Sequence, residues 1–230
     1  MRDRPALLLF ARAPVPGETK TRLIPSLGAE AAAALYHCFL GDALAQARAQ
    51  PADVIVAAAE PAHLPVLGAL VEQACPTAEL MVQRGCDLGE RMLNAFRQTL
   101  RGSYPAAVII GTDAPSLPGR RVSEALSLAE ERDLVLGPCL DGGYYAVGMH
   151  AVIPRLFEGL AWGTPAVLAE TLRRARALKL SVALLEPWYD VDTPEDLGRL
   201  RRQLTAAAPA GEDPPCPRTR QYLFTHPEAE

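Results

Sequence analysis

The sequence predicts a single α/β domain with a mostly parallel central sheet and helices on both of its faces. Short apolar runs of strand length alternate along the chain with longer segments that have helical spacing. The length of 230 residues is compatible with one domain of this class. Because ligands of such sheets bind beyond the carboxyl ends of the strands, the polar motifs that follow the apolar runs are the functional candidates.

Continuous apolar runs predict the strands. The first run, at 6–11, has strand length and contains no charge. Val108, Ile109 and Ile110 make the segment 106–111 the most strand-like of all. The predicted strands, in chain order, are 6–11, 53–59, 78–83, 106–111, 134–137, 144–149 and 181–185.

Apolar side chains at four-residue spacing, helix-forming residues and helix start signals predict the helices. In the segment 87–101 this spacing runs from Leu88 through Met92 and Phe96 to Leu100. The predicted helices are 28–50, 64–75, 87–101, 117–131, 152–157, 165–178 and 194–204.

The C-terminal segment differs in composition from the rest of the chain. From residue 206 onward there are five prolines and no apolar periodicity. This pattern predicts a folded domain at 1–205 and a disordered, proline-rich tail at 206–230.

Composition excludes several classes of protein. Net charge is −4, with 49% hydrophobic and 22% charged residues, which is ordinary for a soluble domain and does not suggest a nucleic-acid partner. The apolar run near the N-terminus is too short for a signal peptide or a membrane span, so a cytoplasmic protein without a membrane partner is expected. Five cysteines without a C-x-x-C pair argue against a disulfide framework or a zinc site.

The loop after the first strand, at 11–23, carries two cations behind two prolines and a glycine. Lys20 and Arg22 can project over the end of the sheet, where a guanidinium fork and an ammonium group both suit phosphate. The alternative is a rigid loop with solvated charges. The chain has neither a Walker A loop nor a G-x-G-x-x-G fingerprint, which argues against a P-loop kinase and an NAD-dependent oxidoreductase.

Carboxylates follow the strand at 106–111 and precede the last helix. Asp113 stands at a strand end, where its carboxylate can hold Mg²⁺ or Mn²⁺. The alternative is that Asp113 caps the next helix, but Ser116 is better placed for that role. Asp190 and Asp192 alternate around one residue, so an extended backbone would point both the same way. Either one is a candidate for a second metal ligand.

Two further segments have both a structural and a functional interpretation. Asp141, Gly142 and Gly143 join two strands, as a hairpin turn or as a site for an acceptor. Asp87, with Glu90 three residues later, fits a capping box, but the helix N-terminus that it begins can also face a nucleotide.

These motifs together resemble a known family. The sequence is similar to the bacterial GT-A-like family once called a domain of unknown function, whose members are named radical-SAM- and selenodomain-associated transferases or arsenosugar-biosynthesis glycosyltransferases. The resemblance covers about residues 6–200. The matching segments, in order, are FARAPVPG at 10–17, KTRL at 20–23, DLGERM at 87–92, GTDAP at 111–115, DGGYY at 141–145, WGT at 162–164 and DVDTPEDL at 190–197.

The resemblance implies a GT-A domain and a role for each matching residue. Asp113 would be the first metal carboxylate and Asp190 or Asp192 the second, with Mg²⁺ or Mn²⁺ as the cofactor. Alanine stands at position 114, where family members often have cysteine, and this departure leaves Asp113 in place. The implied nucleotide-binding residues are Ala11, Arg12, Lys20, Arg22, Gln83, Asp87, Leu88, Gly89, Thr112 and Asp113. The implied acceptor-binding residues are Gly142, Gly143, Tyr144, Trp162 and Thr164.

The expected activity is metal-dependent transfer of a glycosyl group from a nucleotide sugar to a small-molecule acceptor. Catalysis would involve Asp113, Lys20 and, as a general base for an acceptor hydroxyl, Asp141. The first alternative is a nucleotidyltransferase that joins an NTP to a phosphorylated small molecule and releases pyrophosphate. The second alternative is a non-catalytic nucleotide-binding protein.

Overall fold

The computed structural model describes residues 2–206 and 215–226. Seven strands form one sheet in the order β3-β2-β1-β4-β6-β5-β7. β6 runs antiparallel to both of its neighbours, β4 and β5, and the other pairs are parallel. The strands are β1 Ala6–Ala11, β2 Asp53–Ala58, β3 Glu79–Val82, β4 Ala107–Gly111, β5 Leu134–Pro138, β6 Tyr144–Met149 and β7 Val182–Leu184.

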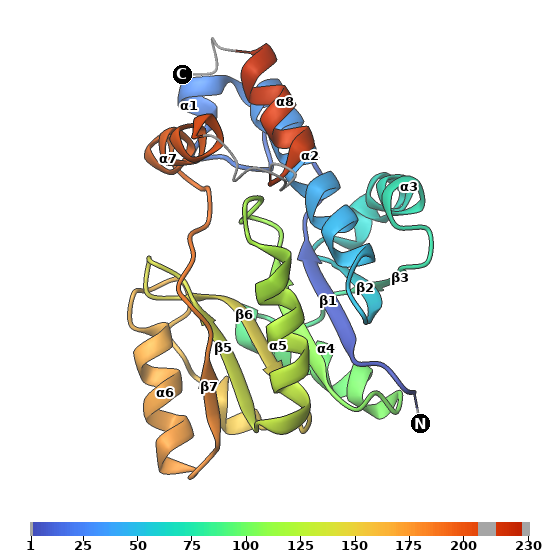
Figure 1. The fold of residues 1–230 in the computed structure, drawn as a ribbon, viewed down its shortest axis with the longest axis vertical. Helices are drawn as coiled ribbons and strands as arrows, with labels where there is room; N and C mark the ends of the chain where they lie inside the picture. Colours follow the sequence, from blue (N-terminus) through green and yellow to red (C-terminus); the bar gives the residue numbers. More distant parts are fainter. Residues whose placement is uncertain (1, 207–214, 227–230) are drawn as a thin grey trace.

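Helices cover both faces of this sheet, so the predicted α/β architecture is confirmed (Figure 1). One core lies between the sheet and the helices α2, α3 and α5, and a second lies between the other face and α4 and α6. The helices are α1 Ile24–Leu27, α2 Ala29–Arg48, α3 Leu64–Ala74, α4 Leu88–Arg101, α5 Gly119–Glu131, α6 Val167–Ala177, α7 Pro194–Thr205 and α8 Pro217–Thr225, with 3₁₀ turns at Pro61–His63 and Pro154–Leu156. No helix in these described ranges is long and apolar enough to cross a membrane.

The strand order places a crevice between β1 and β4. From β1 the chain continues outward through β2 and β3, whereas β4 returns to the other side of β1. The loops that leave β1 and β4 therefore diverge, which is the arrangement that opens a ligand site at the carboxyl ends of the strands.

Two local predictions are wrong. Ser116 does not cap the following helix: α5 begins at Gly119 after Pro118, and the buried Ser116 hydroxyl instead lies 3.4 Å from the Tyr189 hydroxyl. The segment 152–157 forms only one 3₁₀ turn, Pro154–Leu156.

The prediction of a disordered tail is also wrong for Pro217–Thr225, which forms α8 and packs against α2 (Figure 1). The buried Asp42 carboxylate of α2 accepts hydrogen bonds from the backbone N–H groups of Arg218, at 3.1 Å, and Thr219, at 2.9 Å. Leu223 is buried in a third core beside α7. Because Asp42 lies 176 residues before Arg218, in the helix that it caps, the local sequence contains no signal for the start of α8. The rest of the predicted tail, at 207–214 and 227–230, lies outside the described part.

Candidate functional site

A cleft with two connected lobes lies beyond the carboxyl ends of β1 and β4. Arg12, Tyr36 and Asp113 line both lobes. The polar lobe has a volume of about 490 Å³ and is lined by Arg12, Glu18, Thr19, Lys20, Thr21, Arg22, Tyr36, Asp113 and Asp192. The apolar lobe, of about 240 Å³, is lined by Phe10, Ala11, Arg12, Tyr36, Ala59, Gln83, Leu88, Arg91, Met92, Ile109, Gly111, Asp113, Tyr144, Tyr145, Ala146 and Val147.

Lys20 is the central charge of the polar lobe. Its Nζ donates to Asp192 Oδ1 at 2.8 Å and also forms an ion pair with Asp113. The side chain is only 3% exposed and lies beside the rings of Tyr36 and Phe39. Burial alone would lower the pKa of Lys20, but the two carboxylates outweigh burial and raise that pKa above its ordinary value. Lys20 is therefore a fixed cation.

The backbone around Lys20 is held in a strained shape. Lys20 has a φ of 50°, in the left-handed region, which costs a residue with a side chain about 1–2 kcal/mol. The preceding residue, Thr19, is buried and donates from its hydroxyl to the Ala13 carbonyl at 2.7 Å, which folds the loop back on itself. Strain of this kind persists where surrounding contacts fix the backbone, and it clusters at functional sites.

Asp192 reaches the polar lobe from the loop between β7 and α7. Thr193 caps α7: its hydroxyl and the Asp196 carboxylate form a capping box that fixes the start of the helix. The N–H of Val191 donates to the Asp113 carbonyl at 2.8 Å, so the loop before α7 is tied to the loop after β4. This bond brings the two carboxylates to the same ammonium group.

Asp190 has different surroundings from Asp192. It does not line either lobe, although the sequence predicts that the two side chains point the same way. Burial, followed by repulsion from Asp113 and Asp192, raises the pKa of Asp190 to about 7. No group of three or more His, Cys, Asp or Glu side chains within residues 2–206 and 215–226 is arranged to hold a metal ion.

Asp113 and Asp192 nevertheless have the donor chemistry of a magnesium or manganese site. Both side chains are partly exposed, at 43% and 46%, and both already bind a cation, the Lys20 ammonium. Mg²⁺ is commonly held by one or two carboxylates together with substrate phosphates and water. The residues therefore fit a divalent ion that is completed by a phosphorylated ligand.

Tyr36 connects the two lobes. Its hydroxyl accepts a hydrogen bond from the Arg12 N–H at 3.1 Å and shares another with the Thr112 hydroxyl at 2.7 Å. Burial raises the pKa of Tyr36 to about 12, so the hydroxyl stays protonated. One side chain from α2 thus fixes the loops that follow β1 and β4.

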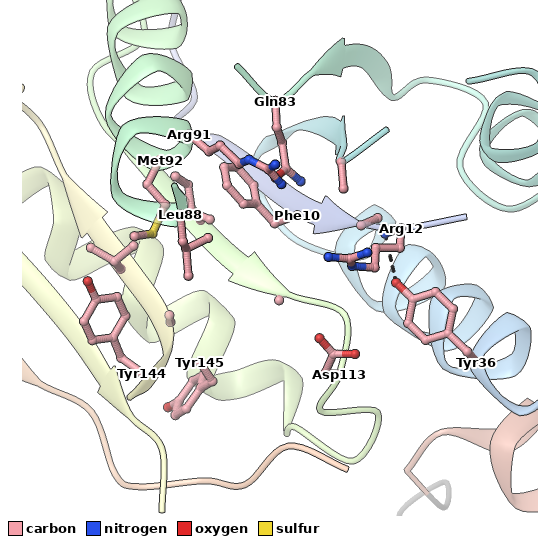
Figure 2. Close-up of a pocket in the computed structure, with 16 residues that line it drawn as sticks. Phe10, Arg12, Tyr36, Gln83, Leu88, Arg91, Met92, Asp113, Tyr144 and Tyr145 are labelled. Carbon is pink, nitrogen blue, oxygen red and sulfur yellow. Dashed lines mark hydrogen bonds between the residues drawn. The ribbon is translucent and has the colours of Figure 1, made fainter. Parts of the chain in front are cut away.

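The apolar lobe is built from strand ends and the first turns of α4 (Figure 2). Gln83 Nε2 donates to the Ala57 carbonyl at 2.8 Å, which fixes its carboxamide at the edge of the lobe. Arg91 lies next to Gln83 and Phe10, whereas Leu88, Met92 and Tyr144 stand at the opposite end from Asp113 (Figure 2). Leu88 is 45% exposed, although it is apolar. This lobe can enclose the face of a ring.

The structure thus brings nine of the predicted residues into the cleft. Eight come from the predicted nucleotide and metal sets, Ala11, Arg12, Lys20, Arg22, Gln83, Leu88, Asp113 and Asp192, and the ninth, Tyr144, comes from the predicted acceptor set. Thr112 lies behind them, buried and bonded to Tyr36.

The other predicted residues lie outside both lobes. Asp87 accepts from the Glu90 N–H at 2.8 Å and caps α4, as expected. Asp141 accepts from the Gly143 N–H at 2.9 Å in the turn between β5 and β6. Gly142 lies against Pro165, Gly89 lies under the Trp162 ring, and the Thr164 hydroxyl donates to the Ala161 carbonyl.

Several residues of the cleft are absent from the predicted set. Tyr36 has only the sequence context of a helix residue, and Arg91 and Met92 appear only as members of a helical motif. The best sequence signal for the apolar lobe is Gly111, a glycine at the end of the most strand-like segment. Glycines in strands often mark close approach of a ligand.

Comparison with known proteins places this chain in a family. The family model described as "Uncharacterized protein conserved in bacteria (DUF2064)" matches residues 43–164, just over half of the chain. No curated protein matches the sequence significantly. A crystal structure from Desulfovibrio desulfuricans G20, with a provisional assignment as a nucleotide-diphospho-sugar transferase, is 32% identical, with a TM-score of 0.87; the match covers 98% of this chain and 96% of that chain.

Two other solved structures share the fold at low sequence identity. CMP:2-keto-3-deoxy-manno-octonic acid synthetase, solved with CTP, is 13% identical, with a TM-score of 0.53 over 86% of this chain and 97% of that chain. Rv0371c from Mycobacterium tuberculosis H37Rv, solved with manganese, is 14% identical, with a TM-score of 0.52 over 86% and 97%. The resemblance drawn from the sequence motifs is confirmed: the chain belongs to the bacterial DUF2064 family and has the GT-A-like fold of nucleotide-diphospho-sugar transferases.

Proposed function

We propose that this protein transfers a glycosyl group from a nucleotide-sugar donor to a small-molecule acceptor. The observation that carries the proposal is the junction of the two lobes at Asp113. A buried cation held by carboxylates lies on one side of Asp113, and an apolar lobe for a ring lies on the other. A nucleoside diphosphate has the same two parts, a polyanion joined to a ring system.

The diphosphate occupies the polar lobe in this proposal. Lys20 supplies a fixed positive charge, and Arg12 and Arg22 line the same space with guanidinium groups. When the bond between the sugar and the diphosphate breaks, negative charge develops on the departing phosphate. Preorganised cations stabilise that charge without rearranging, which is the largest single contribution in many enzymes.

Asp113 and Asp192 would hold Mg²⁺ or Mn²⁺ against the same phosphates. The ion would act as a Lewis acid that neutralises the leaving diphosphate. Lys20 pairs with the same two carboxylates, so its fixed charge would act on the phosphates that the ion holds. The nearest relative in sequence among those described above carries a nucleotide-sugar assignment, which favours this reading.

The acceptor would approach from the Tyr144 end of the apolar lobe, near the turn that holds Asp141. One oxygen of the exposed Asp141 carboxylate accepts from the Gly143 N–H, which orients the group. Asp141 would take the proton from the acceptor hydroxyl as general base, if the bound acceptor extends beyond the lobe to this turn.

Nucleotidyl transfer is the second candidate. Three cations around a polar lobe of about 490 Å³ also suit a triphosphate. In that reaction a phosphate oxygen of the second substrate attacks the α-phosphate of an NTP, and pyrophosphate leaves. The synthetase that was solved with CTP has the same fold, and at 13% identity it serves only as a guide to what to test.

Product analysis separates the two candidates. The protein is first screened by thermal shift with nucleoside diphosphates, nucleotide sugars and NTPs, each with Mg²⁺ or Mn²⁺, because a bound ligand raises apparent stability. Candidate donors are then incubated with a panel of small hydroxylated and phosphorylated acceptors. Release of an NDP from a nucleotide sugar supports glycosyl transfer. Release of pyrophosphate from an NTP, with no NDP from any nucleotide sugar, contradicts it.

A further inference from the structure

Gly111 is unusual among the glycines that the structure describes. For five of them, an added Cβ would meet no atom within 4 Å: Gly17, Gly28, Gly111, Gly159 and Gly163. Four of these have a positive φ, between 64° and 84°, which a side chain adopts only with strain. Gly111 does not. Neither backbone conformation nor protein packing therefore requires glycine at this position.

The fold would be better served by another residue here. Gly111 is the last residue of β4, and glycine weakens a strand because it loses more backbone entropy and packs no side chain. An alanine would fit the strand and its surroundings, because its Cβ would meet no atom of the described structure within 4 Å. Gly111 is exposed at the end of β4, so the space above its backbone is open to a ligand.

That space belongs to the floor of the apolar lobe. Gly111 pairs with Phe10 of β1 across the sheet, and Ile109, on the same face of β4, lies one step deeper. Asp113 follows two residues later and directs its carboxylate into the cleft (Figure 2). A ring that lies on the bare backbone of Gly111 would have Phe10 beside it and Asp113 at its edge.

We propose that Gly111 determines nucleotide binding by leaving room for the ribose ring. This inference rests on the proposed function, in which the phosphates occupy the polar lobe. Ribose is the part of a nucleotide that joins the phosphates to the base, and Gly111 lies between Asp113, which borders the polar lobe, and the interior of the apolar lobe. The carboxylate of Asp113 is suited to accept hydrogen bonds from ribose hydroxyls.

The test uses Gly111→Val and Gly111→Ala in the full chain. Isothermal titration calorimetry measures binding of two probes: inorganic pyrophosphate, and the nucleoside diphosphate that stabilises the wild type most. Valine should weaken nucleoside diphosphate binding at least about tenfold, and alanine should weaken it less, because the added groups occupy space the ribose needs. Pyrophosphate binding and Tm should stay at wild-type values or, for Tm, rise.

Gly198→Ala is the matched control. Gly198 lies in α7, away from the cleft, and an added Cβ would make only an ordinary contact with the flexible Arg202 side chain. This variant should bind both probes as the wild type does. If Gly111→Val proves unstable, Gly111→Ala carries the test, since its Cβ meets no protein atom within 4 Å in the described structure.

The outcomes separate this inference from the proposed function. Wild-type nucleoside diphosphate binding by Gly111→Val overturns the role of Gly111 and leaves the proposed function standing. Equal loss of pyrophosphate and nucleoside diphosphate also overturns it, because the substitution would then act on the polar lobe. A wild-type protein that binds pyrophosphate but no nucleotide overturns both.

Discussion

The two lobes of the cleft are built in opposite ways. In the polar lobe, Asp113 and Asp192 come from two different loops to the buried ammonium group of Lys20, which is paired with both. In the apolar lobe, strand ends and the start of α4 leave a space that no side chain of the described chain fills. In the proposed function, the first lobe acts through charge that is placed before a ligand arrives, whereas the second acts through its shape. Substitutions can separate these two contributions.

The largest expected effect follows loss of the buried cation. Lys20→Met keeps the length of the side chain and removes the charge, so phosphate binding and turnover should fall about 100-fold or more. Binding of a nucleoside without phosphates should change little, since the apolar lobe is intact. Titration with pyrophosphate, nucleoside and nucleoside diphosphate measures the difference.

Lys179 is a matched control for Lys20. It also has a left-handed backbone, with a φ of 57°, but its side chain is exposed after α6. Lys179→Met should leave all three affinities unchanged. A Lys20→Met protein that binds pyrophosphate as the wild type does would contradict the assignment of phosphate to the polar lobe.

Asp113 belongs to both lobes, so its loss should affect more than the loss of Asp192. Asp113→Asn should lower activity about 100-fold and weaken metal-dependent nucleotide binding, whereas Asp192→Asn should lower activity about tenfold. The measurement is activity and nucleotide affinity across a titration of Mg²⁺ and Mn²⁺, with Asp3→Asn as an exposed control. Survival of both metal-dependent binding and activity in Asp113→Ala would show that the metal site lies elsewhere.

Tyr36→Phe should lower activity less than the changes at Lys20 and Asp113, and it should disturb both lobes. The change leaves the Arg12 N–H without its partner and leaves the buried Thr112 hydroxyl only its 3.4 Å bond to the Phe10 carbonyl, which costs about 1–3 kcal/mol of unfolding free energy. KM for the nucleotide should rise several-fold with a smaller change in kcat, because Tyr36 holds the loops and is not expected to take part in the chemical step. Urea unfolding and steady-state kinetics measure the two effects.

Tyr104 offers a comparison for Tyr36. Its hydroxyl accepts a hydrogen bond from the Arg2 guanidinium, and it lines neither lobe of the cleft. Tyr104→Phe should lose some stability without a rise in KM. If both variants raised KM equally, Tyr36 would have no special role in joining the lobes.

The smallest effect on activity is expected at Asp42. Asp42→Ala removes both hydrogen bonds to the start of α8 and should lower the unfolding free energy by about 1–2 kcal/mol, as loss of a helix cap does. Asp42→Asn keeps one oxygen acceptor and should lose less. Activity should change little in either, and limited proteolysis should cut α8 faster in Asp42→Ala. A strong loss of turnover with intact α8 would contradict this purely structural role.

The sequence predicts most of the fold because apolar runs and helical spacing are local signals. It also predicts the polar lobe, since Lys20, Asp113 and Asp192 stand in motifs directly beside strand or helix ends. It does not separate Asp190 from Asp192, because their difference in burial is made by neighbours from other loops. Tyr36, Gly111 and α8 are missed for a related reason: each is defined by contacts, or by empty space, between segments far apart in the chain.

The distance along the chain between Lys20 and Asp192 also affects when the site can form during synthesis. Asp192 lies 172 residues after Lys20. At translation rates of 5–20 residues per second, a nascent chain waits on the order of 10–30 s between making the lysine and making its second counterion. The strained loop around Lys20 cannot be fixed in its final form before then. We therefore expect nucleotide affinity to appear late on the ribosome, only after residue 192 has left the exit tunnel.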